Sequence, residues 1–304
     1  MSSTAETIDD TSRDLGGSAR ALIELTKPGV TRLVLAMAVC GALAAPGHVT
    51  WVRFLVAMFG TALIVGSANT LNMYLERDSD RAMARTRTRP LPSGRLAPST
   101  ALWFGVGQAL VSLPILTFGV NPLTGLLAAT ALISYVLCYT PLKRVTPWAL
   151  HVGAIPGAIP PLIGWAAVTG TLDARAWSIF LLLFVWQLPH FLAIAMFRRE
   201  DYAAAGLRVL PVVKGMRAAK REAVFYSVLQ LACSVLPFLT GLGGFVYLVS
   251  ALVLGVGFLV WAVRGLAPDA GTPWARSLFI ASMPYLVLVS AALVAGVLLP
   301  SGGS

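Results

Sequence analysis

The sequence predicts an all-α polytopic membrane protein that crosses the bilayer nine times. The first reason is composition, because 57% of the 304 residues are hydrophobic and only 12% are charged, with a mean hydropathy of +0.78. Soluble domains carry about twice that share of charged residues. The second reason is length, since the apolar runs approach the roughly 20 residues that a helix needs to span the bilayer. In lipid such a segment must satisfy its own backbone hydrogen bonds, which favours helices.

The apolar runs are separated by charged residues or by Pro and Gly. They predict spans near residues 28–45, 53–75, 99–118, 122–140, 147–168, 175–196, 223–241, 244–263 and 278–298. The junctions Gly119–Pro122 and Gly241–Gly244 are short and uncharged, so the helices on either side should form tight antiparallel hairpins. We find no domain linker, and we expect a flexible cytoplasmic tail over residues 1–20 followed by one domain over 21–304.

The basic residues indicate the orientation. With the N-terminus in the cytoplasm, all of the 23 Lys and Arg residues except Arg53 and Arg175 fall on cytoplasmic segments, as the positive-inside rule requires. This arrangement places the C-terminus in the periplasm. Four acidic residues among the first 20 argue against a secretory signal, so we expect a bacterial inner membrane. The net charge of +10 then faces lipid headgroups or an anionic substrate, and nothing indicates binding to nucleic acid.

Three polar residues interrupt the end of the second span. Asn72, Glu76 and Asp80 are spaced by four and therefore share one face of a helix. Carboxylates stacked at a membrane boundary predict a site for a divalent metal and phosphate, although a solvated helix end with local ion pairs has the same spacing. Asn69 precedes them by about one turn. Its side chain could support the metal site or form a polar contact between helices.

Two long cytoplasmic segments carry both signs of charge and can close over one cavity. After the second span come Arg85 and Arg89, and after the sixth come Glu200, Asp201 and Tyr202. Glu76, Asp80 and Asp201 are the expected ligands of Mg²⁺, which completes its shell with water and substrate phosphate. Forked arginine pairs suit diphosphate oxygens. The residues expected to bind diphosphate are Arg85, Arg89, Lys143 and Arg144.

His190 lies inside the sixth span within Trp186-Gln-Leu-Pro-His190-Phe. Pro189 should kink the helix and widen a pocket. A lone helix histidine is more often a satisfied core residue than a ligand, so both interpretations stay open at this point. The three cysteines, Cys40, Cys138 and Cys233, all fall in apolar runs and are expected to act as small core residues.

Several of these segments resemble the UbiA superfamily of intramembrane prenyltransferases. Asn72-x-x-x-Glu76-x-x-x-Asp80 and the block Arg85–Gly94 (Arg-Thr-Arg-Thr-Arg-Pro-Leu-Pro-Ser-Gly) are similar to its signature. Four further blocks look like its protoheme IX farnesyltransferase (heme O synthase) branch. They are Tyr139–Pro147, Pro160–Trp165, Trp186–Phe191 and Glu200–Gly206. The resemblance runs from about Leu22 to the last span.

The resemblance implies a bundle around a central cavity open near the cytoplasm, with a Mg²⁺-dependent reaction. Farnesyl diphosphate would be joined to a vinyl group of heme B, with addition of water, to give heme O for heme-copper oxidases. Asn72, Glu76, Asp80 and Asp201 would be the catalytic residues. His190, Trp186 and Gln187 would bind heme, with His190 ligating iron or pairing with a propionate. Heme A synthase and oxidase assembly factors would be candidate partners.

Two features depart from the superfamily pattern. Glu76 stands where many members have aspartate, and the second motif offers Asp201 between Phe197 and Ala205 rather than two carboxylates four apart. Two other functions are compatible with parts of this pattern. One is prenylation of another aromatic acceptor such as 4-hydroxybenzoate, which the block around His190 argues against. The other is an anion transporter, whose polar residues would lie near the bilayer centre rather than at the cytoplasmic ends.

Overall fold

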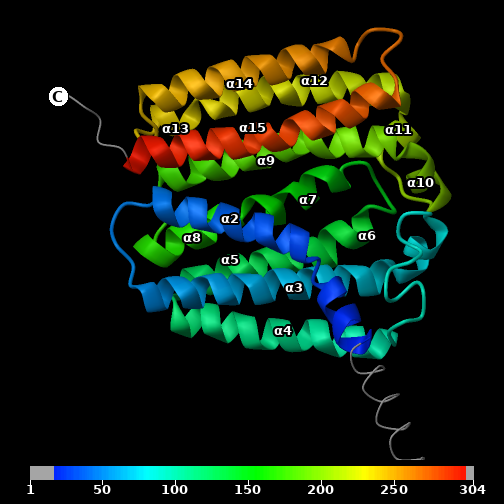
Figure 1. Ribbon diagram of the computed structural model, residues 1–304, viewed down its shortest axis with the longest axis horizontal. Helices are drawn as coiled ribbons and strands as arrows, with labels where there is room; N and C mark the ends of the chain where they lie inside the picture. The colour runs from blue at the N-terminus through cyan, green and yellow to red at the C-terminus, as the bar shows by residue number, and fades with distance from the viewer. Residues whose placement is uncertain (1–16, 299–304) are drawn as a thin grey trace, which may run out of the picture.

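The computed structural model describes residues 17–298, and in this range the chain forms helices and no strand (Figure 1). A helix over Gly17–Leu25 comes first. The elements that follow are α2 (Pro28–Ala44), α3 (Trp51–Ala82), α4 (Pro98–Gly119), α5 (Pro122–Ile133), the π-helix η1 (Ser134–Tyr139), α6 (Thr140–Leu142), α7 (Ala149–Ala158), α8 (Pro160–Thr169), α9 (Ala174–Phe197), α10 (Arg199–Ala204), α11 (Leu210–Val213), α12 (Gly215–Ser234), α13 (Leu236–Leu239), α14 (Phe245–Arg264) and α15 (Thr272–Leu298).

The membrane-spanning architecture confirms the predicted fold class. Within residues 17–298, eight helical segments are long and apolar enough to cross a bilayer. A ninth span results if Gly17–Leu25 and α2, which meet at a bend of 44°, are counted as one broken helix. Most of the tail predicted for residues 1–20 lies outside the described residues, and Gly17–Arg20 already belong to the first helix.

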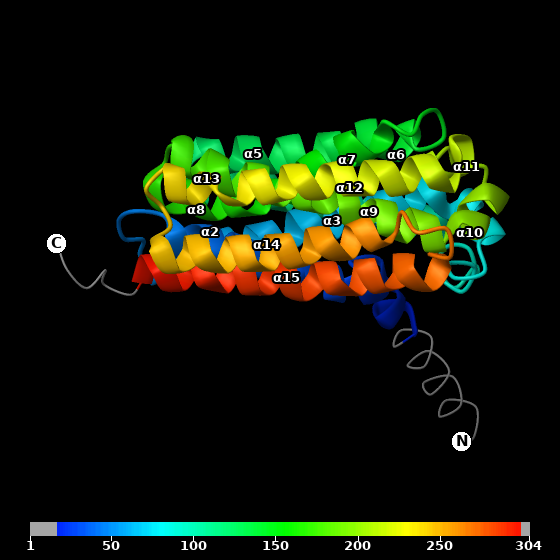
Figure 2. The ribbon, with the colours of Figure 1, turned by 90° about the horizontal axis from the view of Figure 1, so that it is seen from above.

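The long helices run roughly parallel or antiparallel to one another, as Figures 1 and 2 show. Helix α9 lies at the centre and packs against α7, α8, α12 and α15. Helix α2 contacts α3, α8 and α15 and so links the first part of the bundle to the last. These contacts form a ring of helices, α2, α3, α5, α7, α9 and α15, and the inner face of this ring bounds the cavity described below.

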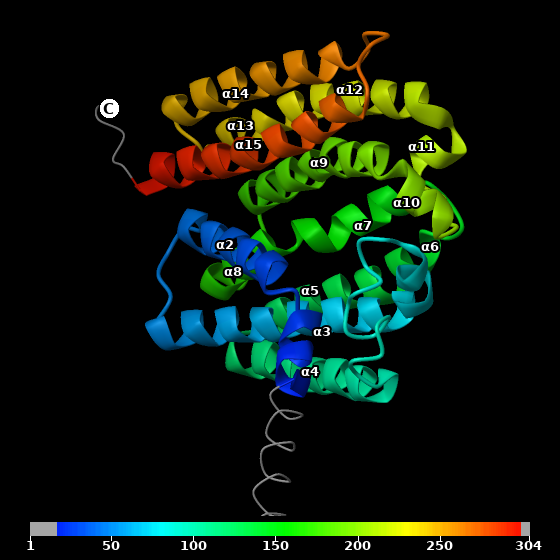
Figure 3. The same cartoon turned by 45° about the vertical axis from the view of Figure 1, so that its right-hand side comes forward.

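The charged connections gather at one end of the bundle. The segment 83–97, α6, α10 and α11 lie together at the right of Figure 1, and Figure 3 shows the same grouping from another side. The loop from α2 to α3, helix α13 and the end of α15 lie at the opposite end. The two charge-rich loops thus lie together at one end of the bundle. Which of the two ends faces the cytoplasm stays a prediction from the positive-inside rule.

Glycines allow α2 and α8 to touch backbone to backbone. A Cβ atom built on Gly164 would overlap the carbonyl oxygen of Ala38, and one built on Gly41 would overlap that of Pro161. Small residues permit such close approach between helices in a membrane. This contact fixes one wall of the cavity, because Met37 from α2 and Ile163 from α8 both line it.

Several helices differ from the predicted spans, and three of these differences concern the site. Helix α3 continues to Ala82, well past residue 75, and therefore carries Asn72, Glu76 and Asp80 on one continuous helix. The fourth span changes from α-helix to π-helix at Ser134. The fifth is broken into α7 and α8 at Ile159, because Pro160 and Pro161 lack the N–H groups that would continue the hydrogen-bond ladder.

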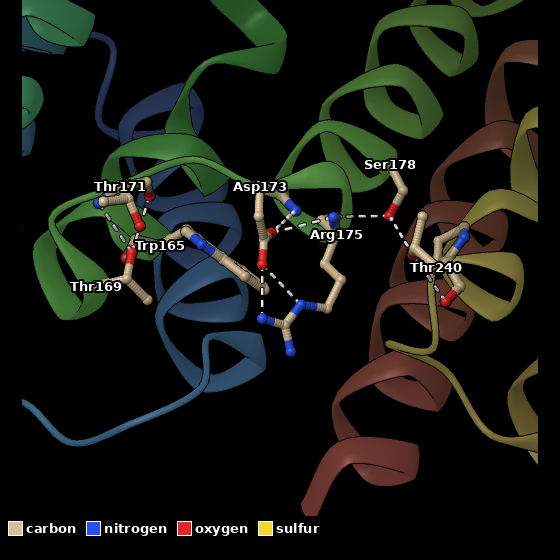
Figure 4. A network of polar contacts seen from close by, with 9 residues as sticks. Trp165, Thr169, Thr171, Asp173, Arg175, Ser178 and Thr240 are labelled. Atoms are coloured by element: carbon tan, nitrogen blue, oxygen red, sulfur yellow. Dashed lines mark hydrogen bonds and ion pairs between the residues drawn. The ribbon is translucent and has the colours of Figure 1, made fainter.

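A polar network fixes the start of α9 (Figure 4). The Asp173 carboxylate accepts hydrogen bonds from the backbone N–H groups of Arg175 and Ala176, both at 3.1 Å. The Arg175 side chain donates back to Asp173 at 2.8 Å, and its guanidinium lies over the Trp165 ring at 5.6 Å. Asp173 is thus the N-cap of the helix that carries Trp186, Gln187 and His190.

Replacing Asp173 with Ala should lower the free energy of unfolding by about 1 kcal/mol, since the cap is lost. Asp173→Asn keeps a capping oxygen and should lose less. Thr171→Ala is the matched control, because in this turn Thr171 takes part only through its backbone. Thermal unfolding of the purified variants in one detergent would rank their stabilities. Equal stability of the Ala variant and the control would contradict the assigned role.

Candidate functional site

Two hollows meet inside the bundle near its charged end. The first, which we call the charged mouth, has a volume of about 550 Å³. The second, the apolar cavity, has a volume of about 340 Å³ and extends between α2, α3, α7 and α9, within the size range of small-molecule sites. Lys27, Val30 and Tyr135 line both hollows. The mouth is lined by Glu24, Lys27, Pro28, Gly29, Val30, Asn72, Glu76, Asp80, Met83, Arg85, Arg89, Tyr135, Lys143, Tyr202 and Leu207.

The two carboxylates of α3 are buried and paired with cations. Asp80 is 1% exposed and accepts a hydrogen bond from Arg89 at 2.7 Å. Glu76 is 9% exposed and forms an ion pair with Lys143. Buried charges of this kind persist only where an opposite charge lies against them. The structure therefore argues against the alternative interpretation, in which these residues form a solvated helix end.

The segment 83–97 folds back over α3 and supplies Arg89. The Thr86 hydroxyl donates to the carbonyl oxygen of Asp80 at 2.8 Å. Leu91 and Leu96 are buried in a small hydrophobic cluster that includes Met73 of α3. Apolar packing thus anchors a segment rich in arginine, because the burial of Leu91 and Leu96 keeps Arg89 beside Asp80.

The donor set fits a Mg²⁺ ion that arrives with a phosphate. Asp80 Oδ1 is fully enclosed and has no hydrogen-bond partner among the described residues. Within residues 17–298, no group of three or more His, Cys, Asp or Glu side chains could hold a metal by itself. Two carboxylates are nonetheless what Mg²⁺ commonly uses, since it takes its remaining ligands from water and substrate phosphate. Glu76 and Asp80 match that pattern.

Asn72 and Lys27 are linked at the border between the mouth and the cavity. Lys27 Nζ donates to Asn72 Oδ1 at 3.3 Å, and Asn72 Nδ2 donates to the Thr140 hydroxyl at 3.0 Å. Lys27 sits in the bend between the first helix and α2 with φ of 49°, a left-handed conformation that is uncommon outside glycine. Asn72 thus uses its amide to position Lys27 and to attach α6 to α3.

The π-helix η1 brings Tyr135, Tyr139 and Lys143 to the site. The rings of Tyr135 and Tyr139 stack at 5.4 Å, and Lys143 Nζ lies 4.6 Å from the centre of the Tyr139 ring. Burial opposes the charge of Lys143, but Tyr139 and Glu76 more than compensate and raise the pKa of its ammonium group. Lys143 therefore stays positively charged beside Glu76.

The structure groups three of the four residues predicted to bind diphosphate. Arg85, Arg89 and Lys143 all line the mouth. Arg144 is exposed and donates to Ser79 at 3.4 Å instead. Tyr202 joins the mouth from α10, and burial raises the pKa of its phenol, so the hydroxyl keeps a proton to donate.

Asp201 does not lie with the two carboxylates of α3. It lines a separate surface hollow with Glu200 and Met216, and its carboxylate faces Arg198 at 3.5 Å. In the short helix α10 the side chain of Tyr202 points to the mouth, and its neighbour Asp201 therefore points elsewhere. The structure thus does not bring together the predicted third metal ligand and the first two.

Trp186, Gln187 and His190 come together on the wall of the apolar cavity. The rings of Trp186 and His190 stack at 4.8 Å. Gln187 Nε2 donates to the carbonyl oxygens of Ala154 and Leu183. Its amide lies against Gly157, where a Cβ atom would overlap the Gln187 side-chain oxygen. The absence of a side chain at Gly157 therefore makes room for Gln187 in the cavity wall.

Sequence reasoning missed Lys27 and Tyr135, the two polar residues shared by both hollows. The signal for Lys27 was its place before Pro28, since proline disfavours α-helix in the residue ahead of it. No sequence signal marked the π-helix that orients Tyr135. Asn69 donates to the carbonyl oxygen of Thr26 at 3.1 Å and also lines the cavity, which identifies it as a contact between helices.

The chain is similar to proteins of known family. Residues 33–283 match the model of the UbiA prenyltransferase family. A protoheme IX farnesyltransferase of Sorangium cellulosum (strain So ce56) is 54% identical over 79% of this chain and 86% of its own length. A protein of the same name from Myxococcus xanthus (strain DK1622) is 49% identical over 90% of this chain and 94% of its own length.

Solved structures share the fold at low sequence identity. A structure described for digeranylgeranylglyceryl phosphate synthase superimposes with a TM-score of 0.78 at 18% identity, over 92% of this chain and 98% of that one. A UbiA homologue from Archaeoglobus fulgidus bound to DMAPP and Mg²⁺ gives a TM-score of 0.68 at 16% identity, over 90% and 98%.

Proposed function

The chain belongs to the UbiA prenyltransferase family, and we propose that it transfers the farnesyl group of farnesyl diphosphate to a vinyl group of protoheme IX (heme B), giving heme O. One observation carries the proposal: a mouth of paired carboxylates and cations adjoins an apolar cavity and shares lining residues with it. A diphosphate on an isoprenoid chain has the same division between a charged head and an apolar tail. The relatives that are 54% and 49% identical support heme as the acceptor.

The cations of the mouth bind the diphosphate and stabilise it as it leaves. Arg89 and Lys143 are held by Asp80 and Glu76 in the structure described here. Arg85 has no ion-pair partner among the described residues and also lines the mouth. Preorganised cations at the position where negative charge develops are a strong source of rate enhancement. Tyr202 adds a neutral hydrogen-bond donor.

Glu76 and Asp80 would hold the Mg²⁺ ion. When bound, Mg²⁺ supplies positive charge that neutralises the departing diphosphate. Asn72 supports the site indirectly by orienting Lys27 towards the border of the mouth. The proposal does not need Asp201 or Arg144, because both lie outside the mouth.

The apolar cavity holds the farnesyl chain and limits access of water. The bond between C1 of the chain and the diphosphate oxygen breaks, and its electron pair leaves with the diphosphate. The vinyl group of heme then supplies the pair for the new carbon–carbon bond. A dry cavity protects the allylic cation from early capture by water. Water then adds to the cation left on the porphyrin side and forms a C–O bond. The resulting oxonium ion releases a proton to water, which leaves a hydroxyl on the former vinyl group.

Trp186, Gln187 and His190 form the part of the cavity wall that would contact the heme acceptor. Aromatic and apolar walls with few polar groups are typical of sites for large flat ligands. The charge-rich end of the bundle would face the cytoplasm of a bacterium, where the positive-inside rule places it. Heme A synthase or oxidase assembly factors are the expected partners, because they would take up the product.

The reaction can be tested directly with the purified protein. Incubation with farnesyl diphosphate, Mg²⁺ and heme B should yield a porphyrin with the mass of heme O, and chelation of the metal should stop the reaction. A parallel incubation with 4-hydroxybenzoate should yield nothing. Prenylated benzoate without farnesylated heme would overturn the choice of acceptor, and no product from either would overturn the proposal.

Removal of either carboxylate should impair the metal site. Glu76→Gln and Asp80→Asn should each lower the rate of heme O formation roughly 100-fold or more, as expected for the loss of a group that stabilises developing charge. Asp78→Asn is the matched control, because its side chain is 66% exposed and, among residues 17–298, forms an ion pair only with Arg81 on the surface. Rates of heme O formation measured over a range of Mg²⁺ concentrations would test this loss. Turnover of the Asp80 variant equal to that of the control would disprove the assignment.

Arg89→Ala should raise the KM for farnesyl diphosphate about 10- to 100-fold. This factor corresponds to the free energy of one charge-assisted hydrogen bond. The KM for heme B should change much less. Arg89→Lys keeps the charge beside Asp80 and separates loss of the forked contact from loss of the ion pair. Arg87→Ala is the control, since Arg87 is exposed and does not line the mouth. Equal changes in the two KM values would indicate a structural role for Arg89.

A further inference from the structure

His190 forms a short hydrogen bond with a residue that no motif of the sequence singled out. Its Nδ1 lies 2.6 Å from the Ser282 hydroxyl of α15. Ser282 in turn donates to the backbone carbonyl of Phe279 at 2.6 Å. Both residues are buried. These two contacts are enough to assign the protons of the imidazole.

Ser282 has one proton to donate, and the carbonyl of Phe279 can only accept it. The hydrogen bond to His190 must then use the proton of Nδ1, with the Ser282 oxygen as acceptor. The opposite assignment would leave the Ser282 oxygen and the Phe279 carbonyl oxygen at 2.6 Å with no proton between them. A doubly protonated ring would put an unpaired charge in an apolar wall, which is costly. The imidazole is therefore neutral with its proton on Nδ1.

His190 lines the apolar cavity, and its other ring nitrogen, Nε2, is not used in the contact with Ser282. It has no hydrogen-bond partner within residues 17–298, and yet it is not among the fully enclosed unpaired atoms of the protein. His190 lines the cavity, and its ring is held between Trp186 at 4.8 Å and Phe279 at 4.9 Å. The ring thus presents a free lone pair to whatever occupies the cavity.

A lone pair on Nε2 distinguishes between the two roles that the sequence left open for His190. A nitrogen without a proton cannot donate to a propionate carboxylate. It can ligate iron, which neutral imidazole commonly does in heme proteins. Histidines that bind metals nearly always donate their other N–H to a neighbouring acceptor, and this contact fixes the orientation of the ring.

We infer that His190 Nε2 ligates the iron of the heme acceptor and that Ser282 is the positioning residue that fixes its tautomer. The inference rests on the proposed function, because it takes heme as the molecule in the cavity. Ligation to a side chain held from both sides would fix the porphyrin at its centre. The vinyl edge would then be held in one place relative to the border at Lys27 and Tyr135.

Porphyrins with and without iron test the ligation. Purified protein is titrated with ferric heme B and with iron-free protoporphyrin IX, and binding is followed by quenching of tryptophan fluorescence. His190→Gln should weaken binding of heme B by more than about tenfold. Binding of the iron-free porphyrin should change less than twofold, since it has no iron to ligate. An equal loss for both porphyrins would overturn the inference.

Ser282 gives a second and independent test. Ser282→Ala should weaken heme B binding roughly tenfold, the usual scale for loss of a partner that orients a metal ligand. Ser282→Thr keeps the hydroxyl and should therefore bind heme B as the wild type does. Trp186 donates to the backbone oxygen of Ser282 at 2.9 Å, so the Ala variant leaves that wall in place. Ser290→Ala, the same change further along α15, is the control.

The spectrum of bound heme keeps the test valid even if a variant fails to fold. Wild-type protein should give the absorption and electron paramagnetic resonance spectra of imidazole-ligated ferric heme, and Ser282→Ala should alter them. Wild-type spectra without an imidazole ligand would overturn the inference. Its failure differs from failure of the proposed function: farnesylated heme would still form in the first case, whereas in the second no product would appear.

Discussion

The requirement that buried charge be compensated organises the charged end of this bundle. Asp80 and Glu76 project from α3 and are almost fully buried, and a buried carboxylate without a partner would cost several kcal/mol. Arg89 and Lys143 supply the opposite charges. These cations belong to two different segments of the chain, so the ion pairs also hold both segments against α3. The same four groups are suited to exchange partners when a metal and a diphosphate enter.

The position of this charge relative to the apolar cavity is what the proposed reaction depends on. Lys27 and Tyr135 line both hollows, so the C1 carbon of a bound prenyl diphosphate would lie close to them. Charge on one side favours departure of the diphosphate, whereas the dry hydrocarbon wall on the other side protects the cation that remains. The residues proposed to contact heme line the apolar cavity from α9. Donor and acceptor would therefore meet inside the ring of helices rather than at the membrane surface.

Much of this could be predicted from the sequence because the strongest signals were local. The spacing of Asn72, Glu76 and Asp80 needs only a helix, and the helix extends through all three. Asp201 could not be placed in the same way, because the direction of its side chain depends on how α10 ends and turns. Ser282 lies 92 residues from His190, and no periodicity reports such a contact. The local sequence pattern predicted the helices, whereas tertiary packing determines which side chains come into contact.

The π-helix between Ser134 and Tyr139 makes the site sensitive to the length of its own helix. A π-turn contains one more residue than the α-helical turn that it replaces, and each residue of an α-helix rotates the chain by about 100°. Loss of a single residue anywhere in this turn would restore a regular α-helix and swing Lys143 away from Glu76. The extra residue therefore sets the direction from which Lys143 reaches Glu76.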